Sequence, residues 1–318
     1  MRLSLSSLST AALLTCGLAF AADAKAPFVK TQAPGWFRFM VGSFEVTALS
    51  DGTVQLPITK LLKDKPEKTA AALKKAFLTG ETVETSCNAY LINTGDKLVL
   101  VDTGAGSLFG PTLGNALASL RASGYTPEQV DEIYITHVHP DHVGGLSTDA
   151  GLVFANATLR IDQADVDFWL SDKNLEAAPA DSKGFFQGAQ KMLGPWVAAK
   201  KLSSFSGATE LTPGIKAEPS HGHTAGHTSY VVESGGQKLV LIGDLMHAAA
   251  VQFSDPGVTI AFDTDAKAAA AERKKAYAAA AKGGYLLGIT HVSFPGVGHL
   301  KAAGKGYEWF PINYTGGK

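Results

Sequence analysis

The 318-residue chain has only two cysteines, Cys16 and Cys87, and almost no net charge. The formal charge is −1, with acidic and basic residues spread along the sequence, so no basic face is available to bind a phosphate backbone. We therefore expect no nucleic-acid partner. The apolar run at residues 8–22 is too short and too near the N-terminus for a membrane span, and no membrane partner is expected. With 45% hydrophobic residues, the chain can nevertheless bury a substantial core.

Residues 1–21 have the pattern of a signal peptide. Arg2 provides the positive start, the apolar run follows, and residues 19–21 form a small-x-small cleavage site, although a cut after residue 24 fits as well. The pattern predicts export to the periplasm or the medium. The residues before Cys16 match a lipoprotein cleavage site poorly.

Cleavage would remove Cys16 and leave Cys87 without a disulfide partner. Cys87 lies at the start of an apparent strand, so we interpret it as a small buried apolar residue. A nucleophilic thiol is the alternative.

The order of apolar runs and turn signals predicts an α/β protein. Strands occur in pairs that alternate with helices in both halves, which favours two sheets packed face to face with helices outside. We expect one main domain over residues 81–318, preceded by an N-terminal extension over residues 22–80. The expected elements are a strand at 44–49 that ends in a turn at Asp51-Gly52, hairpins at 89–102 and 230–242, and helices at 66–77, 111–124 and 265–282.

The stretch ITHVHPDHVGG, residues 135–145, concentrates three histidines and an aspartate in six residues. His137, His139, Asp141 and His142 follow a predicted strand, and short side chains in a loop that leaves a strand end can converge on one point. Imidazoles combined with a carboxylate suit zinc or a similar transition metal better than calcium or magnesium. A solvated polar loop is the alternative, so further ligands are needed elsewhere.

Three further segments place a polar residue at the end of an apolar strand. His223 precedes one strand, and Asp244 and His291 each follow one. A single such histidine is usually structural. Four clusters that together contain all nine histidines indicate a metal centre.

These motifs resemble the metallo-β-lactamase superfamily, whose signature is H-x-H-x-D-H followed by a later His, a bridging Asp and a final His. Stretches such as LVLVDTGAGSLFGPTLG, GKGYEW and PINY are most similar to its methyl parathion hydrolase group. The resemblance implies an αββα sandwich with two metal ions, zinc being expected, at the edge between the sheets. It implies that one ion is bound by His137, His139 and His223, the other by Asp141, His142 and His291, and that Asp244 bridges them.

Two divalent ions that share a water lower its pKa from about 16 towards 7 and polarise a carbonyl or phosphoryl oxygen. Hydrolysis of an ester, lactone or phosphotriester would follow, with Asp244 and Asp141 as catalytic residues and Asp141 helping to move a proton. Asp102 occurs in a single DTG motif, whereas an aspartic protease needs two carboxylates, so we interpret it as a partner of a ligand histidine or as a turn residue. His221, His227 and His299 could be hydrogen-bond donors to ligands or loop histidines bonded to backbone.

The resemblance places Phe109, Trp169 and Phe185 at the mouth of the pocket, where they would favour an aromatic or apolar substrate. Ordinary core packing is the alternative. His247 and Phe262 occupy positions where the organophosphate degraders have leucine, and their bulk should favour a flat lactone or aryl ester over a tetrahedral phosphotriester. We therefore predict lactone or arylester hydrolysis, with weaker phosphotriester hydrolysis. A main organophosphate hydrolase activity, a β-lactamase and a non-catalytic periplasmic metal-binding protein are the alternatives, and the resemblance suggests a homodimer.

Overall fold

The computed structural model describes residues 26–314. The predicted signal peptide, both candidate cleavage sites and Cys16 lie outside the described residues. From Pro34 onward the chain forms one compact unit, and the described residues before it contain neither helix nor strand. No helix in the described part is long and apolar enough to cross a membrane.

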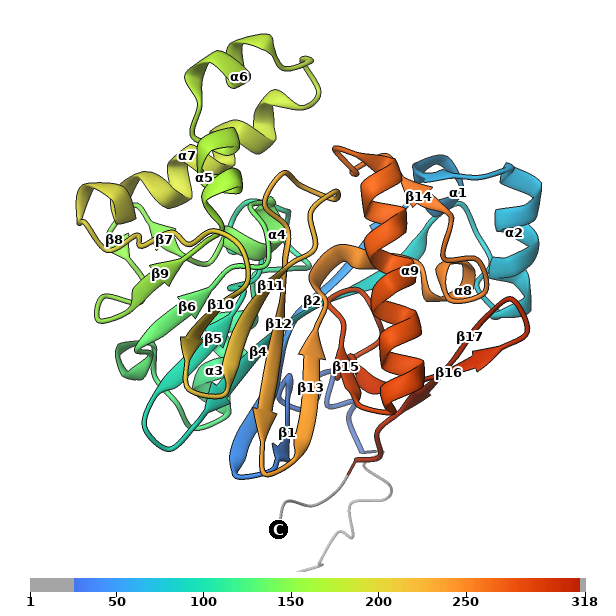
Figure 1. Ribbon diagram of the computed structural model, residues 1–318, viewed down its shortest axis with the longest axis horizontal. Helices are drawn as coiled ribbons and strands as arrows, with labels where there is room; N and C mark the ends of the chain where they lie inside the picture. The colour runs from blue at the N-terminus through green and yellow to red at the C-terminus, as the bar shows by residue number, and fades with distance from the viewer. Residues whose placement is uncertain (1–25, 315–318) are drawn as a thin grey trace, which may run out of the picture. The chain divides into compact units, whose positions relative to one another are not determined.

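Two mixed sheets form the centre of this unit, and helices cover their outer faces (Figure 1). The αββα architecture predicted from the sequence is confirmed. The first sheet has the order β1 (Trp36–Val41), β2 (Phe44–Leu56), β4 (Val83–Asn93), β5 (Leu98–Val101), β6 (Glu132–Tyr134), β9 (Thr158–Arg160). The second has the order β10 (Thr209–Thr212), β11 (Ile215–Pro219), β12 (Thr228–Ser234), β13 (Gln237–Leu241), β15 (Leu286–Gly288), β16 (Val297–Ala303), β17 (Gly306–Pro311).

Short strands and helices surround the two sheets. Two small ribbons pair β3 (Leu62–Lys63) with β14 (Thr259–Ile260), and β7 (Ser147–Thr148) with β8 (Gly151–Leu152). The helices are α1 (Ile58–Leu61), α2 (Pro66–Lys75), α3 (Ala116–Ala122), α4 (Pro140–Val143), α5 (Gln163–Trp169), α6 (Asp172–Ala177), α7 (Lys183–Ala198), α8 (Ala249–Gln252) and α9 (Ala266–Gly283), with short 3-10 turns η1 (Pro127–Gln129) and η2 (Gly243–Leu245).

Alternation along the strands separates the layers of the core. In β5, Val99 points into the cluster between the sheets, whereas Leu98 and Leu100 point to the opposite side, towards α3 and α7. In β13, Leu239 packs between the sheets, whereas Val240 packs against α9. A period of two therefore places both faces of each sheet in apolar surroundings.

The extension predicted over residues 22–80 contributes two strands, β1 and β2, to the first sheet itself. β2 pairs antiparallel with β4 from Glu45 opposite Asn93 to Leu56 opposite Val83. The prediction of a turn at Asp51-Gly52 is wrong. β2 continues through this pair with an irregularity in register between Ser50 and Gly52. The buried Asp51 carboxylate there accepts hydrogen bonds from three backbone N–H groups of residues 105–116, and these bonds override the local preference for a turn.

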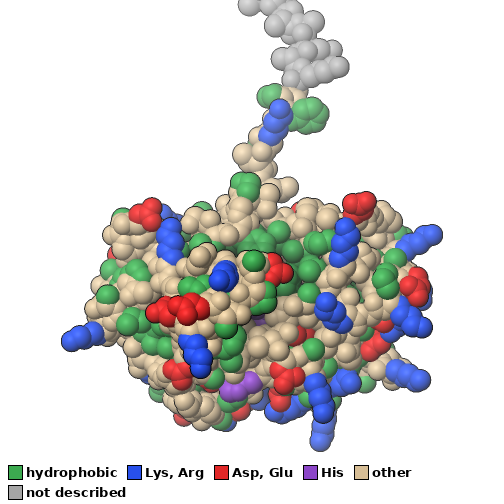
Figure 2. Space-filling view, turned by 90° about the horizontal axis from the view of Figure 1, so that it is seen from above, with side chains coloured by type: hydrophobic (Ala, Val, Ile, Leu, Met, Phe, Trp, Pro, Cys, Tyr) green, Lys and Arg blue, Asp and Glu red, His purple; other side chains and the backbone are tan. Residues whose placement is uncertain are grey.

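The other predicted elements are confirmed near their expected positions. Both hairpins form, as β4–β5 and β12–β13, and α2 and α9 occupy the predicted helical segments. α9 begins after the N-cap Asp265, whose side chain accepts from the N–H of Ala268 at 3.0 Å, and its C-cap is Gly284 in the left-handed conformation. On the face shown in Figure 2, charged side chains of both signs are scattered among apolar ones.

Candidate metal centre

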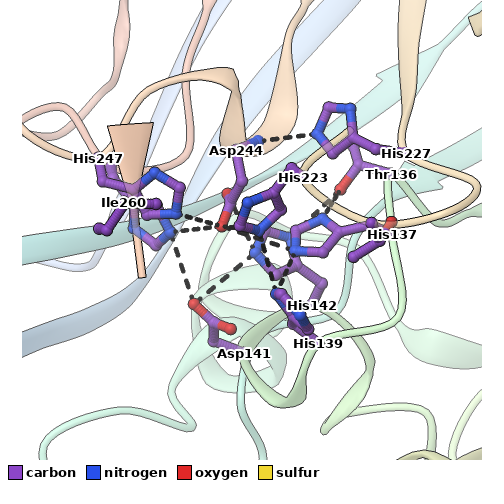
Figure 3. Close-up of polar contacts among 12 residues, drawn as sticks. Thr136, His137, His139, Asp141, His142, His223, His227, Asp244, His247 and Ile260 are labelled. Carbon is purple, nitrogen blue, oxygen red and sulfur yellow. Dashed lines mark hydrogen bonds and ion pairs between the residues drawn. The ribbon is translucent and has the colours of Figure 1, made fainter. Parts of the chain in front are cut away.

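Histidine and aspartate side chains from four segments converge at one edge of the two sheets (Figure 3). They form two groups in which the potential ligand atoms lie within 4.8 Å of one another. The first group, called the three-histidine group below, is His137, His139 and His223 with Asp244. The second is Asp141, His142 and His291, again with Asp244.

Strand direction explains why residues so distant in sequence meet here. β5, β6 and β9 run parallel in the first sheet, and β13 and β15 run parallel in the second. The carboxyl ends of parallel strands lie at the same sheet edge, where polar loop residues gather. His137, Asp244 and His291 are each the third residue after such a strand, β6, β13 and β15 respectively.

In the three-histidine group, ring nitrogens face one another rather than ordinary hydrogen-bond partners. His139 Nδ1 lies 3.0 Å from His137 Nε2 and 3.1 Å from His223 Nε2. Oδ2 of Asp244 is 3.6 Å from the His137 nitrogen and 3.5 Å from that of His223.

The second group has similar spacing. His142 Nε2 is 3.2 Å from Asp244 Oδ1 and 3.7 Å from Asp141 Oδ2. His291 Nε2 is 3.1 Å from Asp244 Oδ2 and 3.6 Å from Asp141 Oδ2. Asp244 therefore presents an oxygen to each group.

These separations fit metal coordination. Ligand atoms about 2.0–2.1 Å from a tetrahedral zinc lie about 3.3 Å apart, close to the distances observed in both groups. His142 Nε2 and Asp244 Oδ1 lie 3.2 Å apart without forming a hydrogen bond, and both are buried with no other hydrogen-bond partner among the described residues. Buried polar atoms are rarely left unpaired, and a cation between these groups would satisfy them.

Each group has an anchor behind its imidazoles. Asp102 Oδ2 accepts from His142 Nδ1 at 2.8 Å, which is the first of the two roles predicted for Asp102. Asp102 has a φ of 61°, a left-handed conformation that costs a non-glycine residue about 1 kcal/mol or more and persists only where the surroundings fix it. Asp263 Oδ1 lies 2.9 Å from His223 Nδ1, and the backbone carbonyl of Ser86 accepts from His291 Nδ1 at 2.8 Å. Such partners fix the tautomer and orientation of ligand imidazoles.

Burial and mutual charge set the protonation of the cluster. Burial, reinforced by neighbouring histidines, holds the pKa of His137 and His139 well below the usual value. Burial alone would raise the pKa of Asp244, but the surrounding histidines hold it well below its usual range. For His223, burial is outweighed by Asp244 and Asp263, which raise its pKa to about 9. His137 and His139 are thus neutral and Asp244 is ionised, whereas, despite burial, Asp244 and its neighbouring carboxylates raise the pKa of His142 and His291 as well as that of His223. Ligand imidazoles must be neutral, so binding of a cation would release the protons held by these three histidines.

The remaining histidines separate into distinct positions. His247 Nε2 is 3.1 Å from Asp244 Oδ2, so this residue belongs to the site wall. His227 is fully buried, and its Nε2 accepts a hydrogen bond from the backbone N–H of Asp244 at 3.1 Å. His221 is exposed and pairs with Asp162, and His299 is an exposed residue of β16.

Two cavities adjoin the centre. A small one of about 30 Å³ lies directly beside the two groups of potential ligands, and its lining includes Phe109, Phe185, His247 and Phe262. A larger one of about 420 Å³ lies between α5–α7 and residues 261–264. Trp169, Phe185 and Phe262 line the larger cavity, and His139 lines both. All five side chains that the sequence assigned to the pocket thus border one of these cavities.

Two features escaped the sequence reading. Asp263, in the polar segment FDTD, gave no sign that its side chain would be buried behind His223. His227 could not be distinguished from His221, because both lie in the same SHGHTAGH segment. Cys87 is buried, as expected, and its thiol lies 3.4 Å from the backbone carbonyl of Asp141.

An αββα sandwich with paired histidine and aspartate groups at the sheet edge defines a metal-dependent hydrolase. The chain belongs to the metallo-β-lactamase superfamily, whose family description matches residues 82–291. Among solved structures, the hydrolase AbOPH of the beta lactamase superfamily is 37% identical, with a TM-score of 0.85 over 90% of this chain and 100% of that one. AidC, a dizinc quorum-quenching lactonase solved with the product N-hexanoyl-L-homoserine, is 29% identical, with a TM-score of 0.81 over 88% of this chain and 98% of AidC.

Among curated proteins, the probable metallo-hydrolase Rv2300c of Mycobacterium tuberculosis is 27% identical over 187 residues. The match covers 51% of this chain and 57% of that protein, as it does for the corresponding protein of Mycobacterium bovis. The chain therefore spans little more than half the length of the curated relatives that it matches.

Proposed function

We propose that this chain is a binuclear-metal hydrolase that cleaves lactones or aryl esters, with weaker activity on phosphotriesters. The observation that carries the proposal is the pair of ligand groups that share Asp244. One ion would be held by the three-histidine group and the other by Asp141, His142 and His291, with Asp244 between them. Each ion would have three ligands of its own and would share Asp244, so a water or a substrate would raise its coordination number to five, which catalytic zinc sites allow.

Two ions bound here, for which we propose zinc, would supply a nucleophilic hydroxide at neutral pH and polarise the carbonyl oxygen. The protein's own side chains would transfer a proton, exclude water and hold the substrate. Asp141 is the least buried of the ligands, with 16% of its side chain exposed at the small cavity, so it is placed to pass a proton to the leaving oxygen. Phe262 and Phe185 exclude water and hold an apolar substrate.

Cavity shape supports the order of substrates. The space beside the metal groups is only about 30 Å³, and His247 and Phe262 border it. A planar carbonyl group fits such a slot more easily than a tetrahedral phosphorus with three substituents, while the adjoining cavity of about 420 Å³ can take an apolar remainder. The likeness to AidC, a lactonase, agrees with this order. The methyl parathion hydrolase group remains a proposal about ancestry.

The test combines metal analysis with kinetics on a matched panel of dihydrocoumarin, an aryl ester, an N-acyl homoserine lactone, methyl paraoxon and nitrocefin. We expect two ions per chain and a kcat/KM on the lactone or aryl ester at least about tenfold above that on methyl paraoxon, which corresponds to about 1.4 kcal/mol in barrier height. The opposite order would make phosphotriesters the main substrate class. Metal uptake without turnover of any substrate would leave a metal-binding protein.

We also propose that the chain is exported, on the basis of the pattern in residues 1–21 alone. N-terminal sequencing of protein from a periplasmic fraction should begin at residue 22 or 25, whereas full-length protein in the cytoplasm would contradict export. The homodimer stays a prediction that light scattering can check.

A further inference from the structure

The three-histidine group is assembled from two loops that are far apart in sequence. His137 and His139 follow β6, whereas His223 lies between β11 and β12. The two loops must be held at a fixed separation, because a displacement of a few tenths of an ångström spoils metal coordination. A buried side chain that touches both loops is therefore of interest.

Asp165, on α5, touches both. Its Oδ2 accepts a hydrogen bond from the backbone N–H of Val138 at 2.9 Å and another from the Thr224 hydroxyl at 2.9 Å. Its Oδ1 accepts from the backbone N–H of Gly226 at 2.6 Å. Val138 stands between the two ligand histidines of the first loop, and Thr224 directly follows His223. The side chain of Asp165 is completely buried.

The glycine at position 226 indicates that this approach is built into the sequence. A Cβ atom there would lie 2.5 Å from the backbone nitrogen of Asp165 and 2.9 Å from its Cβ. Such distances are far below van der Waals contact, so any side chain would force the loop away from α5. An ionised carboxylate has acceptor atoms only, so Asp165 can accept all three hydrogen bonds without presenting a hydrogen of its own.

The same helix forms a wall of the larger cavity. Trp169 is one helical turn beyond Asp165, on the same side of α5, and it lines the cavity of about 420 Å³. Its ring centroid lies 5.3 Å from that of His139. α5 thus connects the ligand loops to the surface that would receive the apolar part of a substrate.

We propose that Asp165 is a positioning residue that fixes the three-histidine group as a unit and sets its distance from the wall of the larger cavity. This inference rests on the proposed binuclear function. The other group has its own anchor, since Asp102 bonds His142. Loss of the Asp165 carboxylate should therefore weaken one metal position and spare the other.

The experiment measures the affinities of both metal positions in wild type, Asp165→Asn and Asp167→Asn. Asp167 is on the same helix, but it is exposed and bonded only to Gln163 among the described residues, so it is the matched control for the same chemical change. An asparagine at 165 replaces one acceptor oxygen with an amide NH2, which would face the backbone N–H of either Val138 or Gly226. Zinc titration against a competing chelator and the visible spectrum of the Co²⁺-loaded protein report the two positions separately.

We expect Asp165→Asn to retain one ion and to bind the second about 10–100-fold more weakly, while Asp167→Asn binds both as wild type does. The KM for substrates with a large apolar group should rise together with the loss of kcat. If Asp165→Asn does not fold, Thr224→Val removes a single donor and should give the same selective loss at smaller size.

Equal weakening of both positions, or no change in either, would overturn the inference. The proposed function fails by a different result, namely a wild-type protein that binds no pair of ions or hydrolyses nothing on the panel.

Discussion

Replacing His227 by phenylalanine tests whether this imidazole supports Asp244, the residue proposed to bridge the two ions. His227 Nε2 accepts from the backbone N–H of Asp244, and the Nδ1 side faces Ser220, whose hydroxyl is 2.9 Å away and whose carbonyl is 3.2 Å away. Phenylalanine keeps a flat ring in the same space and removes both polar atoms. The N–H of Asp244 would then be buried without an acceptor.

An unsatisfied buried N–H costs about 1–3 kcal/mol, and the lost contact with Ser220 adds about 1 kcal/mol. We expect the free energy of unfolding to fall by about 2–4 kcal/mol in His227→Phe. His221→Phe is the control, because it makes the same substitution six residues earlier at a side chain that is 44% exposed and has one ion pair, with Asp162. Exposed pairs contribute about 0–1 kcal/mol, so this control should remain near wild type.

The assay is urea denaturation of chelator-treated protein, followed by far-UV circular dichroism. With a slope of about 3 kcal/mol per M, the midpoint of His227→Phe should move by about 1 M. A shift of the same size in His221→Phe, or none in His227→Phe, would refute the assigned support of Asp244.

Three other predictions follow from the described contacts. Burial lowers the pKa of His227 from 6.5 to about 3, so between these pH values the unfolded chain binds more protons than the folded chain. The free energy of unfolding of the metal-free protein should therefore fall by up to about 1.4 kcal/mol per pH unit as the pH drops through this range. His227→Phe should show a shallower fall. Gly104→Ala should destabilise by several times more than Gly95→Ala in thermal or urea melts, because both glycines have positive φ but only at Gly104 would a Cβ lie 2.2 Å from the Asp51 carboxylate; equal losses would count against it. Phe262→Leu should raise the ratio of kcat/KM on methyl paraoxon to that on dihydrocoumarin by about tenfold, and an unchanged ratio would show that this ring does not restrict the cavity.

Three of the candidate ligands could be found in the sequence because each follows a strand signal at the same short interval. β6, β13 and β15 are apolar and easily recognised, and His137, Asp244 and His291 each come three residues later. Local pattern is enough there, since strand direction then decides where the side chains meet. The αββα layers followed from the same pairing of strands with helices.

Contacts made by loops could not be found in this way. His221 and His227 have nearly the same neighbours in sequence, yet the first is exposed and the second is buried beneath Asp244. Asp165 and Asp263 are acids in polar surroundings, whose usual place is the surface. Their burial depends on which loops pack over α5 and α9, and these contacts have no local sequence period.

Asp244 would help to hold the two halves of the sandwich together. It comes from the second sheet, whereas His137 and His142 come from the first, so a cation held among them would cross-link the sheets without a covalent bond. Such a link contributes RT ln(1 + [L]/Kd) only while both sheets are docked, about 4 kcal/mol at a free ion concentration of about 1,000 times Kd. The described part of the chain has a single free cysteine, so a bound metal ion, rather than a disulfide, would hold the two sheets together. The protein's melting temperature would then depend on the concentration of that metal ion in its surroundings.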